Sequence, residues 1–206
     1  MGEPADRFPL FPLGLVLLPT EVVPLHIFEE RYKLMIGHCI EEECDFGIVW
    51  LAEGGLRDVG CSATVTQVLE RLEDGRMNIL VRGDRPFQIV RRIEDLPYPA
   101  ADVEFLDDRE EGRDEALADS AHDSYADLVE HVTGERPAPD QVAELSSYAM
   151  ASTIELSAEP KQSLLEQRSE ADRLRAVGEL FGVARARLEK AEEALEAARS
   201  NGKVRF

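Results

Sequence analysis

Four prolines interrupt the apolar segment near the start of this 206-residue chain: Pro9, Pro12, Pro19 and Pro24. Proline lacks a backbone N–H, fixes φ and disfavours the helical region for the residue before it, so a continuous helix cannot form here. The segment is therefore predicted to be extended chain with turns. Helical spacing of apolar residues begins only at Phe28 and continues to Cys39, which predicts one helix over residues 28–39.

Alternation of apolar and polar residues predicts strands up to about residue 107. These strands cover residues 46–51, 63–72, 76–81, 87–93 and 103–105. Asp74-Gly75 separates two of them, and because this pair tolerates positive φ it predicts a β-hairpin of 63–72 and 76–81. The segment from Gly83 to Phe87 is interpreted as a tight bend between two strands, since a single glycine beside an aspartate makes a weak phosphate cradle.

The composition changes after Asp107, where a charged stretch precedes sequence rich in Ala, Leu and Glu. We therefore predict two consecutive subdomains, 1–108 and 109–206. Helices are expected over 117–132, 140–149 and 157–165, followed by a long final helix. That helix carries a heptad seam of Leu174, Val177, Phe181, Ala184, Leu188, Ala191, Leu195 and Ala198. The favoured interpretation is packing within its own bundle; the alternative is that the part beyond Leu188 meets a second copy or a partner.

The order of these motifs resembles the N-terminal substrate-binding domain of Lon proteases. That domain opens with a proline-punctuated "PLFPL" strand, a "PL-x-IFE" strand and a helix beginning "E-x-RY", and this chain has all three, followed by similar glycine positions. The signature residues are Pro9, Phe11, Pro12, Arg31, Tyr32, Gly60, Gly75 and Gly83. The resemblance implies an α+β fold: a strongly bent, PUA-like β pseudo-barrel with one covering helix, then a helical bundle ending in a long helix. This chain departs from the family in the loop 83–87, which is one residue longer.

The resemblance also implies a function, namely a stand-alone, non-catalytic module that binds a polypeptide substrate or partner protein, as an adaptor or regulator in proteolysis. Candidate contact residues are His26, Phe28, Trp50 and Phe87. Arg31 is expected to tie its helix to a carboxylate or to strand carbonyls through its planar guanidinium. A small hydrolase with an unrecognised site and an RNA-binding barrel remain the alternatives, and the oligomeric state stays open between monomer and weak homodimer.

Charge and composition argue against nucleic acids and membranes as partners. Asp and Glu outnumber Lys and Arg by 42 to 23, and such a surface repels the phosphate backbone of nucleic acids. No secretory signal pattern is evident, and no run approaches the roughly 20 apolar residues that cross a bilayer, so we expect a cytoplasmic protein without membrane contact.

The residues that usually carry catalysis or bind metals are not arranged for either. His38, Cys39 and Cys44 lie close in sequence but lack the paired spacing of a zinc site, so no metal is expected. The three cysteines favour reduced thiols over a disulfide framework. Neither G-x-x-x-x-G-K-[ST] nor G-x-S-x-G occurs, and we predict no cofactor and no catalytic residue.

We expect the purified chain to hydrolyse neither ATP nor casein, because the phosphate loop and the nucleophile motifs are missing. Phosphate release and fluorescent casein assays on gel-filtration fractions measure this directly. Activity that co-elutes with the chain at constant specific activity would contradict the prediction.

Overall fold

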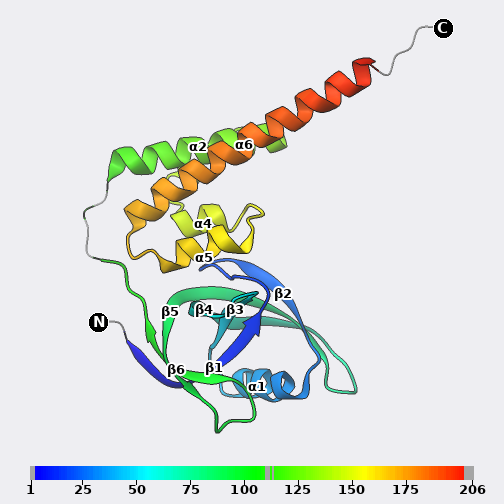
Figure 1. The fold of residues 1–206 in the computed structure, drawn as a ribbon, viewed down its shortest axis with the longest axis vertical. Helices are drawn as coiled ribbons and strands as arrows, with labels where there is room; N and C mark the ends of the chain where they lie inside the picture. The colour runs from blue at the N-terminus through cyan, green and yellow to red at the C-terminus, as the bar shows by residue number, and fades with distance from the viewer. Residues whose placement is uncertain (1–2, 110–111, 113, 202–206) are drawn as a thin grey trace, which may run out of the picture. The chain divides into compact units, whose positions relative to one another are not determined.

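A computed structural model describes residues 3–109, 112 and 114–201 and shows a mixed α+β architecture (Figure 1). One six-stranded sheet and most of the helices are in separate parts of the chain. The elements are β1 Pro4–Leu13, β2 Val22–Ile27, α1 Glu30–Glu41, β3 Phe46–Ala52, β4 Gly55–Arg71, β5 Met77–Ile93, β6 Ala100–Phe105, α2 Glu115–Thr133, α3 Pro139–Val142, α4 Ser147–Ala151, α5 Ala158–Glu166 and α6 Glu170–Asn201. In this described part of the chain, no helix combines the length and the apolar character needed to cross a membrane.

The strands follow the order β2-β5-β4-β3-β1-β6, with a further pairing between β5 and β6. Only β1 and β3 run parallel, and every other pair is antiparallel. The proline-punctuated segment forms β1 and β2, as predicted, and the long strand β5 contacts three neighbours. The sheet therefore depends on β5 more than on any other strand.

Apolar side chains of several strands meet in a buried cluster of Phe8, Leu10, Val49, Phe87, Ala101 and Val103. Phe8 and Phe87 pack edge to face with ring centroids 5.5 Å apart, a favoured arrangement of aromatic rings. Helix α1 covers another part of the sheet with its buried residues, and the ring of Tyr32 lies 4.2 Å from that of Phe11. The predicted helix over 28–39 is thus confirmed with a shift of two residues.

The connection between β1 and β2 is held against β5 at Gly83. Gly83 donates its N–H to the Glu21 carbonyl and accepts from the Thr20 N–H, both at 2.9 Å, and a Cβ on Gly83 would overlap the Leu18 carbonyl oxygen. The Glu21 carboxylate in turn accepts from the Leu18 N–H at 2.9 Å and pairs with Lys161 of α5 at 2.5 Å. Both side chains of this ion pair are largely buried, at 12% and 13% exposure, so α5 is fixed to the sheet.

The structure corrects the predicted bend between Gly83 and Phe87. Strand β5 is continuous from Met77 to Ile93, and the pairing with β4 shifts register opposite residue 62 instead of turning. The Ser62 hydroxyl donates to the Arg85 carbonyl at 3.2 Å and accepts from its N–H at 3.0 Å. These two bonds satisfy the backbone where the ladder is interrupted, so the extra residue forms a β-bulge.

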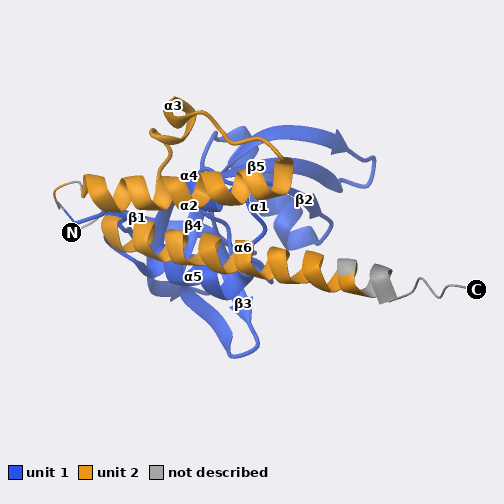
Figure 2. Ribbon diagram, turned by 90° about the horizontal axis from the view of Figure 1, so that it is seen from above, with its two compact units in different colours: residues 1–111, 148–170 blue, residues 112–147, 171–206 orange. Residues whose placement is uncertain are grey.

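The chain divides into two compact units that are not consecutive (Figure 2). One contains residues 1–111 and 148–170, and the other contains 112–147 and 171–206, whereas the sequence predicts subdomains 1–108 and 109–206. The difference arises from α5, because Leu164 and Leu165 are buried and Gln162 donates to the Val59 carbonyl of β4 at 3.1 Å. The change of composition correctly marks where the strands end, but it does not reveal that residues 148–170 pack back onto the sheet.

Helices α2 and α6 lie side by side in the second unit and run in the same direction (Figure 2). The residue numbers of the contacting pairs increase together along both helices. Ala121 lies beside Gly178, and the rings of Tyr125 and Phe181 are 5.5 Å apart. Further along, Asp127 pairs with Arg185 at 2.7 Å and His131 with Glu192 at 3.4 Å. Hydrogen bonds from Arg136 and Arg185 hold the pKa of the Asp127 carboxyl below its usual range. Helix α2 ends at Gly134 with φ 80°, which confirms the predicted stop.

The helix predicted over 140–149 is instead two short helices, α3 and α4. Residues 143–146 between them are not helical, and the Leu145 carbonyl lies 2.9 Å from Nε2 of His122. A side chain of α2 thus provides a hydrogen bond that an uninterrupted helix would make internally. Helix α5 begins after Ser157, as predicted, although the Ser157 hydroxyl makes no cap hydrogen bond.

The heptad seam of α6 is buried along only part of its length. Leu174, Val177 and Phe181 are buried, whereas Leu188 and Leu195 are 39% and 60% exposed. Internal packing, the favoured interpretation of the sequence, therefore applies to the first half of the seam. The side chain of Ala198 lies outside the described part of the structure.

The predicted hairpin is confirmed. Strands β4 and β5 pair antiparallel out to Arg71 and Met77, and Gly75 has φ 81°, a conformation that side chains with a Cβ resist. Its N–H bonds to the Leu72 carbonyl at 3.0 Å. The Arg76 N–H donates to the Asp74 carboxylate at 3.1 Å, and this bond lowers the pKa of that carboxyl.

Gly75→Val should lower the free energy of unfolding by about 1–3 kcal/mol, because valine is strained at positive φ. Urea unfolding followed by circular dichroism measures the change. Gly54→Val is the matched control, since Gly54 also lies in a turn but has negative φ and open space around it. Equal urea midpoints for the two variants would contradict the assigned strain.

Replacing both Leu188 and Leu195 by Asp should cost only about 1–2 kcal/mol, because both side chains are exposed and Asp is a weaker helix former than Leu. Phe181→Asp places a charge in a fully buried site and should cost about 4 kcal/mol or more. Thermal unfolding compares the two, and light scattering on the double variant reports any change of oligomeric state. Collapse of the helical unit in the double variant would show that these leucines are structural.

Candidate functional site

Strand β2 presents two different faces. Leu25 and Ile27 point into the core and are buried, while Val22, Pro24 and His26 alternate with them and are exposed. Successive side chains of a strand point to opposite sides, so this alternation follows directly from the sequence VVPLHI. The exposed face is opposite Arg82, Leu80 and Asn78 of β5.

Strand β2 is also the free edge of the sheet. Among the strands in the described residues it alone pairs with a single neighbour, β5. No strand within residues 3–109, 112 and 114–201 pairs with the other side of β2, which makes this edge a site where an extended chain can add. Pro24 removes one donor from the strand, and proline within a sheet is typical of edges because it limits indiscriminate pairing.

A line of polar side chains crosses the exposed face from β2 to β4. Nδ1 of His26 lies 2.7 Å from Oδ1 of Asn78, and Nδ2 of Asn78 donates to Glu70 at 2.8 Å. With the amide in this orientation, Nδ1 of His26 donates to Asn78, and Nε2 is the acceptor of the corresponding neutral tautomer. The ring of Phe28 stacks on that of His26 at 5.8 Å, so an aromatic face and a polar edge are presented together.

These side chains border an open cavity of about 540 Å³, which we call the β2 groove. It is lined by Pro24, Leu25, His26, Leu69, Glu70, Asn78 and Ile79. Phe28 beside it is 58% exposed and Leu69 is 50% exposed. Exposed apolar side chains grouped around a cavity at a sheet edge are typical of an interaction surface.

The structure brings together two of the four predicted contact residues. His26 and Phe28 lie in contact at the β2 groove, whereas Trp50 belongs to β3, where the guanidinium of Arg57 lies 5.3 Å from its ring centroid. Phe87 is completely buried in the core cluster. A bound chain could reach Phe87 only if the sheet opened, so Phe87 is a core residue.

Sequence reasoning missed Val68 and Leu69, which are 38% and 50% exposed near the tip of the hairpin. Strict alternation places Leu69 on the same face as Ala63, which is fully buried. The pairing shifts register after Val65 and again after Val68, so alternation is lost. Two adjacent apolar residues in an otherwise alternating strand were the available signal.

Arg31 contacts a carboxylate at the start of its own helix, Glu29, and the ring of the adjacent Tyr32. Its Nε donates to the Glu29 carboxylate at 2.9 Å, and its guanidinium lies 4.6 Å from the ring centroid of Tyr32. Burial of Tyr32 is the main reason why the pKa of its hydroxyl is raised. Arg31 therefore supports the start of α1 and the aromatic contact with Phe11 of β1.

The histidines with observed contacts face groups that do not form a nucleophile pair. His26 contacts an amide, His122 a backbone carbonyl and His131 the carboxylate of Glu192. Throughout residues 3–109, 112 and 114–201, no three His, Cys, Asp or Glu side chains are grouped to hold a metal ion. The geometry of the β2 groove supports binding of an extended chain.

The matching family model and the similar known sequences point to the same family. The sequence model described as the ATP-dependent protease La (LON) substrate-binding domain matches residues 7–181. Lon protease 1 of Bacillus subtilis is 28% identical over 199 residues, covering 86% of this chain and 25% of the relative. Lon protease 2 of Desulfotalea psychrophila is 27% identical over 196 residues, covering 84% and 24%. This chain thus spans about a quarter of the length of these relatives.

Solved structures agree with the fold. A Lon N-terminal domain protein from Xanthomonas campestris has a TM-score of 0.61 at 26% identity and covers 82% of this chain and 95% of that one. The N-terminal domain of the Mycobacterium avium complex Lon protease has a TM-score of 0.64 at 24% identity and covers 87% and 98%.

Proposed function

The chain belongs to the family of Lon substrate-binding domains, and from that premise we propose that it binds polypeptides and catalyses no reaction on them. The observation that carries this proposal is the β2 groove. It joins a free strand edge, an exposed aromatic pair and exposed aliphatic side chains in one surface. Each of these features fits a chain in extended conformation.

Side chains contribute more to this binding than main-chain pairing does. Pro24 takes one N–H from β2, so an added strand makes an incomplete ladder. Phe28 and Leu69 offer apolar area, and Nε2 of His26 offers a hydrogen-bond acceptor. The groove therefore favours apolar segments that bring a donor, such as those exposed in unfolded proteins.

We also propose that the bent sheet is a PUA-like pseudo-barrel. Strand pairing from β5 through β4, β3, β1 and β6 and the additional β5–β6 pairing support this description. Among the described strands, such closure would protect every edge except that of β2. Binding would then be directed to β2 by the topology of the sheet.

In proteolysis, the chain would act as an adaptor or regulator that captures a polypeptide for a protease. The match to a substrate-binding domain supports this role. The distinguishing measurement is the rate at which a separate Lon protease degrades casein with and without the added chain. An adaptor changes the rate, and a binder without this role leaves it unchanged.

Phe28→Ala should weaken binding of a permanently unfolded polypeptide about 5- to 30-fold, equivalent to roughly 1–2 kcal/mol for an aromatic contact. Reduced, carboxymethylated α-lactalbumin with a fluorescent label is a suitable probe, and fluorescence anisotropy gives its Kd. Phe28 is 58% exposed, so the variant should fold normally.

Val90→Ala is the matched control, because Val90 is 66% exposed on the same strand that pairs with β2 but lies outside the groove. The control should bind as the unmodified chain does. Equal weakening in both variants would show that the β2 groove is not the binding surface. Absence of binding by the unmodified chain would overturn the proposed function itself.

A further inference from the structure

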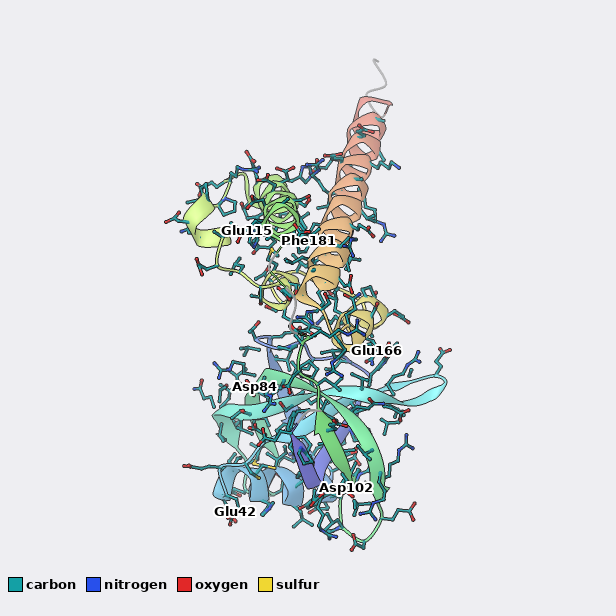
Figure 3. The ribbon with its side chains drawn as sticks, turned by 90° about the vertical axis from the view of Figure 1, so that its left-hand side faces the viewer. Glu42, Asp84, Asp102, Glu115, Glu166 and Phe181 are labelled. Carbon is teal, nitrogen blue, oxygen red and sulfur yellow. The ribbon has the colours of Figure 1, made fainter. Side chains whose placement is uncertain are left out.

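Two of the three cysteines lie together at the end of α1. Cys39 is 2% exposed and belongs to the last turns of the helix, while Cys44 is half-buried in the turn that leads to β3. Both side chains line a cavity of about 420 Å³, together with Glu43 and residues 64–68 of β4. Figure 3 labels Glu42, which lies between the two cysteines in sequence.

The helix ends in a way that folds Cys44 back onto Cys39. Glu43 has φ 51°, the left-handed conformation that closes a helix, and the Cys44 N–H donates to the Cys39 carbonyl at 3.0 Å. This six-to-one bond is the mark of a Schellman motif, in which the two residues that it joins bring their side chains together. The Cys39 and Cys44 side chains line the same cavity.

The backbone geometry is compatible with a covalent bond between them. Standard bond lengths add only about 4 Å to the 3.0 Å hydrogen bond, so the two Cα atoms lie no more than about 7 Å apart. Disulfides join Cα atoms separated by about 4.4–6.8 Å. The Cα separation therefore permits a disulfide between these two residues.

We propose that Cys39 and Cys44 are a redox-modification site, at which a hydroperoxide converts the two adjacent thiols into a disulfide. Cys44 is the accessible partner and Cys39 the buried one, which gives them separate roles. Burial raises the pKa of the Cys39 thiol, so Cys39 keeps its proton until it reacts. The open cavity beside Cys44 gives a small oxidant access.

The reaction proceeds in two balanced steps. Cys44 Sγ attacks one peroxide oxygen and the O–O bond breaks. The thiol proton goes to the departing oxygen, so the products are a sulfenic acid on Cys44 and one water or alcohol. Cys39 Sγ then attacks the Cys44 sulfur, the S–O bond breaks, and the hydroxyl leaves as water with the Cys39 proton. Together the two thiols lose two protons and two electrons, and the peroxide is reduced.

Mass spectrometry of the whole chain after treatment with hydrogen peroxide tests this site. Free thiols are alkylated, and the unreduced protein is cut by a protease that cleaves after glutamate. Glu41, Glu42 and Glu43 lie between the cysteines, so a disulfide holds two fragments together. We expect linked fragments that have lost two hydrogens and that dithiothreitol separates.

Matched cysteine variants show which thiols form the disulfide. Cys61 is fully buried, and its Sγ donates to the Ser62 carbonyl at 3.3 Å, so Cys61→Ser should form the same link as the unmodified chain. Cys39→Ser should form no link, and its Cys44 sulfenic acid should instead be trapped by dimedone. Three results would each overturn the site: three free thiols after treatment, links to Cys61 as frequent as the Cys39–Cys44 link, or a link that forms only in urea.

Discussion

The close approach of the β1–β2 connection to Gly83 is the constraint on which the sheet-containing unit depends. Two backbone hydrogen bonds join residues 20 and 21 to Gly83, and the space there admits no Cβ. The same connection positions the Glu21 carboxylate between the Leu18 N–H and Lys161. A buried ion pair is stable only if both partners are held in place, so one glycine on β5 determines where β2 begins and where α5 packs.

This arrangement also explains why the candidate surface lies at β2. The anchored connection delivers β2 to one side of β5, whose other neighbours are β4 and β6. Among the described strands, β2 therefore pairs with β5 on one side and with no strand on the other. The exposed pair of His26 and Phe28 follows at its end, before α1 turns the chain away. The path of residues 16–28 thus determines both the position of β2 in the sheet and the position of the candidate site.

Local signals in the sequence predicted much of this structure, because proline, glycine and helical spacing act over a few residues. The extended start, the hairpin at Asp74-Gly75, helix α1 and the stop at Gly134 all follow from such signals. Non-local features did not, since the continuity of β5 depends on Ser62 bonding to Arg85, and the exposure of Leu69 depends on bulges in β4. For the site, sequence identified His26 and Phe28, but burial of Phe87 depends on packing against Phe8 from a distant strand.

The interleaving of the two units has a consequence for synthesis on the ribosome. The first 111 residues cannot complete their unit, because residues 148–170, with Lys161 and the apolar side of α5, still have to follow. At a translation rate of about 5–20 residues per second, the 59 residues from 112 to 170 take roughly 3–12 s to appear. During that interval the nascent sheet carries an unpaired Glu21 and an uncovered apolar surface, and the emerging α2 has no α6 to pack against. The order in which the segments leave the exit tunnel therefore sets the earliest point at which each unit can be completed.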